Sequence, residues 1–428
     1  MRHGFFLFFV ILTISVGACK HAPIIPPLDP TPPPDPIDTT QTPENPSKLK
    51  IIWQVPVRPD TSYWGSMSPK ITGEWVWFSR IDFVGNKEDL VAINRQSGAR
   101  VCDWTPPVNS TVMARPSGSG TFEDRLVVNY NNETYGFKDG VCTDQWASIV
   151  PLIGNGGFRI NLIGDHVYHM HTQPSHRDTA NYLVRTHVSA TNWDTIFSLS
   201  LKNGYHPTIE LPVSWVNAAG DTILFFQNRQ FNFSKLDGQV DLWAINLRTK
   251  KMVWMVEDWD ISGNSSVTPP IVAGNRLYIS GAYTLHCFDT ESGQKMWQRD
   301  FPNDNLFSTN LLWAEQKVFV RPSTSGNLYA LDAQTGAIIY QVPDTGTSDI
   351  NMVYHKGMIY FTNSTRPFLY VVRASDGALV LKEYSPNYFN PGKANRNANL
   401  RWDVTVDPQL NRLYCSDGYF YMAIELPQ

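Results

Sequence analysis

The sequence predicts an all-β fold, an eight-bladed β-propeller whose last blade is closed by a strand from near the N-terminus. A pair of short apolar strands recurs eight times, at intervals of 41 to 56 residues. Strand pairs at periods of about 40–50 residues are typical of propellers. Runs with helical spacing are absent between the copies, and the C-terminal copy lacks an outer strand that the N-terminal region can supply.

Residues 1–18 are predicted to be a signal peptide. The apolar run Gly4–Ile14 follows a short polar start and is succeeded by small residues. This is the pattern of a secretory signal, and the run is too short to span a membrane as a stable helix with its flanks.

The end of this segment, Val16–Cys19, resembles the bacterial lipobox, in which an aliphatic and two small residues precede a cysteine. The resemblance implies cleavage before Cys19, acylation of its sulfur and its new amine, and a lasting membrane anchor, because each buried CH₂ of an acyl chain contributes about 0.8 kcal/mol. The resemblance also disfavours retention at the inner membrane, because Lys20 stands where that signal usually has Asp. We therefore expect the outer membrane, on its periplasmic side or at the cell surface. A plain secreted protein with a chance cysteine is the alternative.

Residues 19–47 are expected to hold the lipidated cysteine and a linker. Ten of the 26 residues in Ala22–Ser47 are proline, and aromatic residues are absent. Such a stretch cannot bury a core and favours extended polyproline II, reaching roughly 80 Å if straight. We interpret it as a stalk; the alternative is a ligand for a proline-binding groove.

Residues 48–428 are the predicted propeller domain, and each repeat supplies two central strands of one blade. The first strands contain Val76–Phe78, Leu126–Val128, Val167–His169, Ile223–Phe225, Leu277–Ile279, Val318–Val320, Ile359–Phe361 and Leu413–Cys415. The second strands contain Leu90–Ile93, Thr134–Phe137, Leu183–Thr186, Leu242–Ile245, Leu285–Phe288, Leu328–Leu331, Leu369–Val372 and Phe420–Ala423.

The turn after the second strand carries the clearest repeat. Cys287–Trp297 in blade 5 and Ala330–Tyr340 in blade 6 resemble the A-x-D-x-x-T-G-x-x-x-W repeat of pyrroloquinoline-quinone-type propellers. The resemblance is strong in three blades and degenerate in the others. The departures are Leu381 in the Trp place of blade 7, Lys250 in the Gly place of blade 4, Trp104 and Trp146 lying two residues late in blades 1 and 2, and Phe197 as the ring of blade 3.

The residue types of this repeat point to structure and not to a ligand. Glycine allows the positive φ of a tight turn, aspartate caps the turn, and the terminal ring is expected to pack between neighbouring blades. The strand Ile51–Val55, with Trp53 as its ring, is expected to complete the eighth blade, so that no sheet edge is left open. Seven blades plus an extra domain is the competing arrangement.

Composition narrows the function. Only 17% of residues are charged, the net charge is −4, and Lys/Arg-rich runs are absent, which argues against a nucleic-acid groove. The resemblance to quinoprotein dehydrogenases implies adjacent cysteines and a calcium site of Glu, Asn and Asp. The cysteines of this domain, Cys102, Cys142, Cys287 and Cys415, are all separate. We therefore expect no cofactor and no enzymatic activity.

Two clusters leave alternatives open. His169 and His171 share a strand face and, with His176, have residue types that a transition metal accepts, although strand histidines also occur by chance. Cys102 and Cys142 lie near outer strands of neighbouring blades in a compartment that permits disulfides, but their offsets from Trp104 and Trp146 differ by two. The sequence does not decide whether they pair.

Loops outside the repeat are the first places to look for binding. Three stand out, namely Thr172–Asn181, Arg229–Asp241 and the Asn- and aromatic-rich Tyr384–Trp402. The last suits sugar hydroxyls and faces, a protein partner, or plain decoration of the fold.

The whole chain resembles quinoprotein-like propeller lipoproteins and, in architecture, the propeller lipoprotein of the outer-membrane β-barrel assembly machinery. The resemblance implies a lipid-anchored, non-catalytic scaffold that binds protein in the cell envelope, with a role in outer-membrane protein assembly as the finer expectation. A surface glycan-binding lipoprotein is the alternative, and a quinone-dependent dehydrogenase ranks below it.

Overall fold

The computed structural model describes residues 47–57, 67–82, 87–107, 116–130, 133–138, 142, 145–149, 161–171, 180–188, 192–200, 206–209, 211–232, 235, 237–260, 268–306, 309–346, 350–363, 367–388, 398–400 and 402–427. These residues form strands and turns, and none of them lies in a helix.

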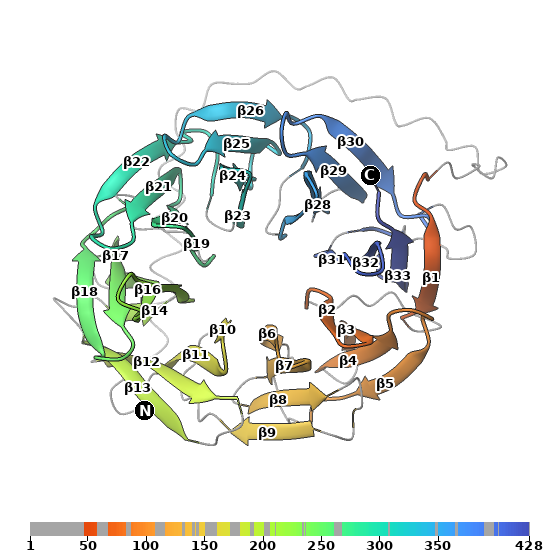
Figure 1. Cartoon of the computed structure of the whole chain (residues 1–428), viewed down its shortest axis with the longest axis horizontal. Coiled ribbons are helices and arrows are strands. Elements are labelled where there is room, and N and C mark those ends of the chain that lie inside the picture. Colours follow the sequence, from red (N-terminus) through yellow and green to blue (C-terminus); the bar gives the residue numbers. More distant parts are fainter. Residues whose placement is uncertain are drawn as a thin grey trace, which may run out of the picture. The chain divides into compact units, whose positions relative to one another are not determined.

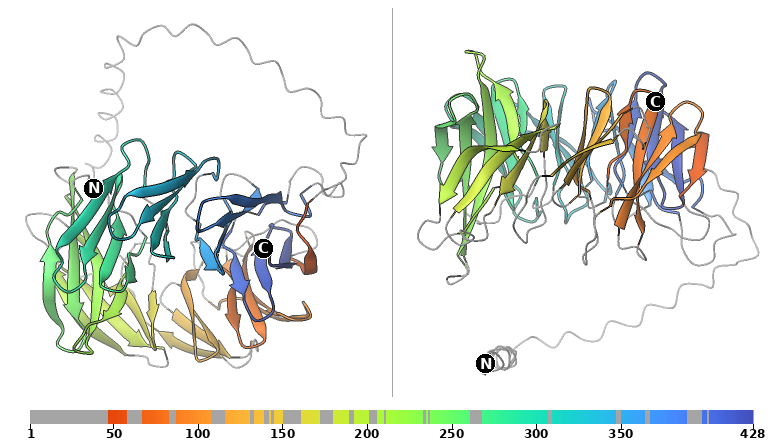
Figure 2. Two further views of the ribbon diagram at one scale, coloured as in Figure 1. Left: turned by 45° about the horizontal axis from the view of Figure 1, so that its top comes forward. Right: turned by 90° about the horizontal axis from the view of Figure 1, so that it is seen from below.

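The strands form eight antiparallel sheets arranged as blades around a central axis (Figure 1), which confirms the predicted eight-bladed propeller. Within a blade the strand nearest the axis comes first in sequence and the outermost strand last, except in blade 8. Figure 2 shows the same ring from two further sides, with the turns gathered at its two rims.

Blade 1 contains β2 (Lys70–Thr72), β3 (Trp75–Asp82), β4 (Lys87–Asn94) and β5 (Arg100–Trp104), and blade 2 contains β6 (Pro116–Phe122), β7 (Arg125–Tyr130), β8 (Glu133–Lys138) and β9 (Gln145–Ile149). Blade 3 contains β10 (Asn161–Ile163), β11 (His166–His171), β12 (Ala180–His187) and β13 (Trp193–Ser200). Blade 4 contains β14 (His206–Ile209), β15 (Val213–Val216), β16 (Thr222–Asn232), β17 (Asp237–Asn246) and β18 (Lys251–Val256). Blade 5 contains β19 (Ile271–Ala273), β20 (Arg276–Ser280), β21 (Thr284–Asp289) and β22 (Lys295–Asp300), and blade 6 contains β23 (Leu311–Ala314), β24 (Lys317–Val320), β25 (Leu328–Asp332) and β26 (Ile338–Val342). Blade 7 contains β27 (Val353–His355), β28 (Met358–Phe361), β29 (Phe368–Arg373) and β30 (Leu379–Tyr384). Blade 8 contains β31 (Thr405–Asp407), β32 (Arg412–Ser416), β33 (Phe420–Glu425) and β1 (Ile51–Pro56).

The two central strands of a blade such as blade 5 are buried on both faces, because a neighbouring blade covers each face. Leu277, Tyr278 and Ile279 of β20 are consecutive and all buried. A strand buried on both faces appears in sequence as a continuous apolar run, without alternation. These runs are the ones that the sequence predicted as first and second strands.

The innermost strands were not predicted. Lys70–Thr72, Asn161–Ile163 and Thr405–Asp407 are each three residues long. Three residues carry too little periodicity to be recognised. Blade 8 consequently has two predicted strands at the C-terminus and a third, β31, that precedes them.

One contact joins an outermost strand to the next blade around the ring, and we call it the wedge contact. The ring of Trp297 on β22 lies against Gly336 in the turn of blade 6, and its Nε1 donates a hydrogen bond to the Ala333 carbonyl at 3.1 Å. Trp254 on β18 makes the same contact with blade 5, through the Thr290 carbonyl at 3.0 Å. Outer strands are thus fixed by the following blade as well as by their own.

Two separate constraints, the backbone conformation and the closeness of a ring, require glycine in these turns. Gly293 and Gly336 have φ of +71° and +69°, a region that other residues avoid. A Cβ on either would also lie 2.7 or 2.6 Å from ring atoms of Trp254 or Trp297. The predicted structural role of the turn glycine and the ring is therefore confirmed.

The degenerate blades keep the wedge position with other residues. Trp254 pairs across its blade with Ala244, just before a register shift. Phe197 and Leu381 occupy the equivalent positions in blades 3 and 7. Lys250, in the glycine place of blade 4, adopts φ of +55°.

The wedge position of blade 1 belongs to Cys102, which pairs with Ala92 just before the register shift of that blade. Cys102 forms a disulfide with Cys142 of blade 2, with the two Cα atoms 5.9 Å apart. A covalent bond therefore stands where other blades use a ring on a turn. Trp104, two residues later, instead packs against Tyr135 of blade 2 at a centroid distance of 4.8 Å.

The ring closes as predicted, through the N-terminal strand. β1 pairs antiparallel with β33 and forms the outermost strand of blade 8. Trp53 on β1 makes the wedge contact with blade 1: its Nε1 donates to the Arg95 carbonyl at 3.1 Å, and a Cβ on Gly98 would lie 2.7 Å from its ring. The alternative of seven blades with an extra domain is excluded.

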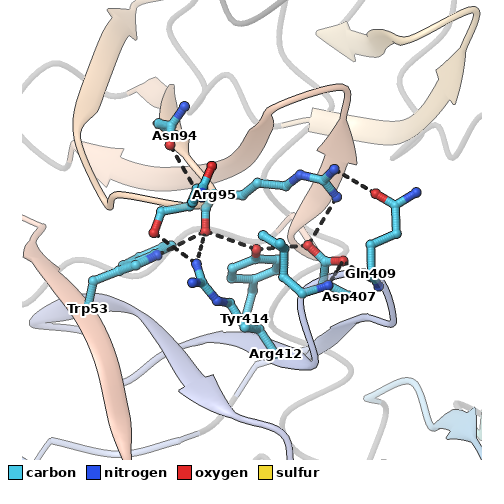
Figure 3. Close-up of polar contacts among 9 residues, drawn as sticks. Trp53, Asn94, Arg95, Asp407, Gln409, Arg412 and Tyr414 are labelled. Carbon is cyan, nitrogen blue, oxygen red and sulfur yellow. Dashed lines mark hydrogen bonds and ion pairs between the residues drawn. The ribbon is translucent and has the colours of Figure 1, made fainter.

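Polar groups reinforce this seam between blades 8 and 1 (Figure 3). The Arg95 carbonyl also accepts hydrogen bonds from the Tyr414 hydroxyl at 3.3 Å and from the Arg412 guanidinium. The Arg95 side chain forms an ion pair with buried Asp407 at 3.1 Å and donates to Gln409 at 2.7 Å. Main-chain and side-chain groups of one turn thus hold two blades together.

We expect Trp53→Ala to lower the free energy of unfolding by about 3–5 kcal/mol, because it empties a buried ring site at the seam. Chemical denaturation measures the change. Ile52→Ala is the matched control, since Ile52 is 40% exposed and surface substitutions usually change stability by less than about 0.5 kcal/mol.

Deletion of residues 20–47 should leave the melting temperature nearly unchanged and deletion of residues 20–56 should lower it sharply. Similar melting temperatures of the two deletion variants would contradict closure of the ring by β1.

We expect reduction of the Cys102–Cys142 disulfide to lower the free energy of unfolding by about 2–4 kcal/mol, because the bond closes a loop of 40 residues in the unfolded chain. Thermal melting with and without a reductant measures this. The double variant Cys102→Ser/Cys142→Ser should melt, with or without the reductant, at the melting temperature of the unmodified protein in reductant. An equal response of that variant to the reductant would assign the effect to another group.

Candidate interaction surface

The structure describes the three predicted binding loops to different extents. Of Thr172–Asn181, only Ala180 and Asn181 lie within the described residues, and both belong to β12. The prediction for the rest of that loop lies outside them. Arg229–Asp241 and Tyr384–Trp402 are described in part.

Arg229–Asp241 was expected as a loop, and this is corrected by the structure: most of it continues the hairpin of β16 and β17. Gln230 pairs with Gln239 across the hairpin, and β14 pairs with the other edge of β16. Gln230 is buried and donates a hydrogen bond to Asp241 at 2.5 Å. Buried amides replace the apolar run of a central strand here, and that is why the pattern was interpreted as a loop.

The described part of Tyr384–Trp402 brings aromatic rings together. Tyr384 lies 4.3 Å from Phe368 and 4.4 Å from Tyr388, measured between ring centroids. All three rings are half-buried. The ammonium of Lys382 lies 5.0 Å from the Phe368 centroid and 2.6 Å from an Asp344 oxygen. We call Phe368, Tyr384 and Tyr388 the aromatic ledge.

A buried carboxylate fixes the segment that carries the ledge. Asp417 of blade 8 accepts hydrogen bonds from Ser385 Oγ at 2.6 Å and Asn387 Nδ2 at 2.9 Å, and also from the backbone amides of Tyr419 and Phe420. Burial raises the pKa of Asp417, and these hydrogen bonds oppose the shift. The ledge is therefore tied to the next blade.

Sequence reasoning found Tyr384 and Tyr388 but missed Phe368. Phe368 pairs directly with Tyr384 across the strands β29 and β30. The aromatic residue at the start of β29 was the available signal, and it becomes informative only once the strand register is known.

The histidine cluster is resolved only in part. His176 lies outside the described residues, and for His169 and His171 the structure gives strand positions alone. A different pair meets: His166 faces His187 across β11 and β12, with Asp165 Oδ1 2.5 Å from His166 Nδ1. Desolvation opposes the shift, but the hydrogen bond with His166 leaves the pKa of Asp165 below its usual value. Among the described residues no group of His, Cys, Asp or Glu is arranged to hold a metal ion.

The predicted lipid-attachment residue, Cys19, lies outside the described residues. Within the part of the chain that is described, no helix is long and apolar enough to cross a membrane.

The outermost strands present apolar side chains to solvent. These residues precede the wedge ring by one or two positions, and each is 41–50% exposed. We call them the apolar belt; in blades 4 to 7 they are Met252, Val253, Met296, Ile338, Ile339 and Leu379. Repeated apolar exposure at strand edges is a feature of interaction surfaces. Their spacing within the turn repeat was a signal present in the sequence, and the sequence analysis did not use it.

Comparison with protein families matches residues 237–405 to the family described as outer membrane protein assembly factor BamB. The matched segment holds the strongest repeats and the whole apolar belt. One curated relative, a tetrathionate hydrolase of Acidithiobacillus ferrooxidans, is 21% identical over 203 residues. That match covers 40% of this chain and 40% of the length of the hydrolase.

Solved structures share the fold at low identity. BamB from Moraxella catarrhalis matches with a TM-score of 0.54 and 13% identity, covering 88% of this chain and 99% of that one. Quinohemoprotein alcohol dehydrogenase from Comamonas testosteroni matches with a TM-score of 0.62 and 10% identity, covering 92% and 78%. A europium-containing methanol dehydrogenase matches with a TM-score of 0.60 and 9% identity, covering 86% and 84%.

The fold is thus shared by an assembly factor and by enzymes, so the fold alone does not choose between them. The family match, the repeated turn and the solved structures agree on one point: the chain carries a PQQ-like β-propeller that resembles BamB.

Proposed function

We propose that this protein is a lipid-anchored, non-catalytic scaffold of the cell envelope that binds a protein partner and acts in outer-membrane protein assembly. The observation that carries the proposal is the match of residues 237–405 to the BamB family. Those residues form β17 and β18 of blade 4 and all of blades 5 to 7, and they carry the apolar belt.

The anchor is part of the proposal. A signal peptide of residues 1–18 would be removed before Cys19, and residues 19–47 would link the lipid to the propeller. Ser47, the first described residue, donates a hydrogen bond to the Tyr384 carbonyl at 3.1 Å, and Leu49 is buried in the core between blades 7 and 8. Ser47 and Leu49 would therefore fix the end of the linker to the propeller before β1 begins.

The apolar belt is the proposed contact surface for the partner. Its side chains lie on outermost strands, whose outer edges have no neighbouring strand in the described sheets. A partner that covers Met296 and Ile339 would remove apolar area from water, at about 25 cal/mol per Å². A charged side chain introduced into the belt by substitution would oppose that burial.

We expect Cys19→Ser to abolish lipidation and release the protein from the membrane fraction, because the acylated sulfur would be lost. Metabolic labelling with a fatty acid, followed by fractionation, measures both effects. Cys287→Ser, which alters a buried cysteine, is the control and should label normally. Equal labelling of Cys19→Ser would contradict the anchor.

Mild crosslinking in membranes, followed by mass spectrometry, tests the scaffold. We expect a barrel-assembly subunit among the crosslinked partners, and we expect Ile339→Lys to reduce its yield several-fold. Gln334→Lys is the matched control, because Gln334 is exposed in the turn of the same blade and outside the belt. A sugar-uptake porin as the main partner would favour the glycan-binding alternative, and dye-linked alcohol oxidation by purified protein with added quinone and calcium would contradict the non-catalytic proposal.

A further inference from the structure

The aromatic ledge has a chemistry that the scaffold proposal does not use. Phe368 begins β29, Tyr384 ends β30, and Tyr388 follows four residues later; the rings of Tyr384 and Tyr388 are tilted at 33° to each other, and both residues are half-buried. A core aromatic cluster would be covered on all sides, as Phe361 and Tyr370 are in the same blade. The ledge keeps part of its ring surface in water.

Polar groups with fixed orientation flank these rings. Lys382 and Asp344 form an ion pair beside Phe368, so that the local charge is balanced. On the other side Asn387, which directly precedes Tyr388, donates through Nδ2 to Asp417 and to Gln54 Oε1 at 3.1 Å. These two contacts and a third, to Met422 Sδ at 3.5 Å, orient the amide, and Oδ1 is its acceptor atom.

The orientation of Asn387 is built into the fold. Asp417 is 2% exposed and receives two side-chain and two backbone hydrogen bonds. The backbone amide of Asn387 also donates to Ser385 Oγ at 3.1 Å. An exposed amide that is held this way loses little conformational entropy when it binds a ligand.

Flat rings, an oriented amide and a balanced ion pair suit one ligand class. The face of a pyranose ring presents C–H groups that pack on an aromatic ring, while its rim presents hydroxyls that both donate and accept. A hydrophobic peptide would use the rings but not the polar flanks. A charged ligand would find the nearest ammonium and carboxylate already paired.

We propose that the aromatic ledge, with Asn387, Lys382 and Asp344, binds a neutral oligosaccharide. The site lies on blade 7 at the junction with blade 8, beside Ser47, where the linker enters the propeller. The proposal adds a ligand to the scaffold and does not depend on the protein partner.

Isothermal titration of the full-length lipoprotein in detergent, with cellotetraose and chitotetraose as probes, tests the site. We expect binding of at least one probe and a loss of roughly tenfold in affinity for Tyr388→Ala, equivalent to about 1.4 kcal/mol. Tyr388→Phe should retain binding because the ring face remains. Tyr283→Ala is the matched control, since Tyr283 is 46% exposed on blade 5 and far from the ledge in the repeat order.

Further measurements separate this proposal from the scaffold. Asn387→Ala should also weaken binding, and thermal melting verifies that each variant is folded. Absence of binding by both probes, or equal binding by Tyr388→Ala and the unmodified protein, would overturn the saccharide site and leave the crosslinking result untouched. Loss of the crosslinked partner in Tyr388→Ala would make the ledge a protein contact and would overturn the saccharide proposal as well.

Discussion

The wedge contact is the interaction on which the rest of this structure depends. An outermost strand has a neighbouring strand on one side only, so its position within the blade is held weakly. A ring such as Trp297, placed on the turn of the following blade, supplies the missing constraint and satisfies a turn carbonyl at the same time. Blades 1, 5, 6 and 7 each receive such a ring from the previous blade, so the stability of the outer strands that carry these rings depends on the neighbouring blade.

This dependence explains why one junction is covalent and another is polar. Cys102 holds the wedge position of blade 1, and its bond to Cys142 stands where other blades place a ring on a turn, while Trp104 packs against Tyr135 beside it. At the seam between blades 8 and 1, Trp53 keeps the usual contact, and Arg95, Asp407 and Arg412 add hydrogen bonds around the same turn. The two junctions flank blade 1, so the blade next to the closing strand is held from both sides.

The fold was largely predictable and the candidate surface was not, for physical reasons. Central strands such as Leu277–Ile279 are buried on both faces, so their apolar runs are visible without knowledge of the partner strands. Trp53 could be matched to the blade lacking its ring, because the repeat fixes where rings occur. The amides of Arg229–Asp241 hid a strand, and the pairing of Phe368 with Tyr384 depends on register, which sequence spacing alone does not determine. The disulfide also depends on register: Cys102, and not Trp104, holds the wedge position of blade 1, so the spacing from Trp104 does not predict which residues lie opposite each other.

The closing strand has a consequence for the time course of folding. Trp53 pairs with Ala423, 370 positions later in the chain. Contacts of such long sequence separation form slowly, since a large loop must close before any pairing energy is gained. During synthesis, β1 would emerge long before β33 and stay without its partner strand, as an apolar segment that other chains can bind. The fold therefore requires that β1 be protected until β33 has been synthesised. The proline residues ahead of Ser47 lack backbone N–H groups, so that part of the chain cannot extend the unpaired strand with a full ladder of hydrogen bonds.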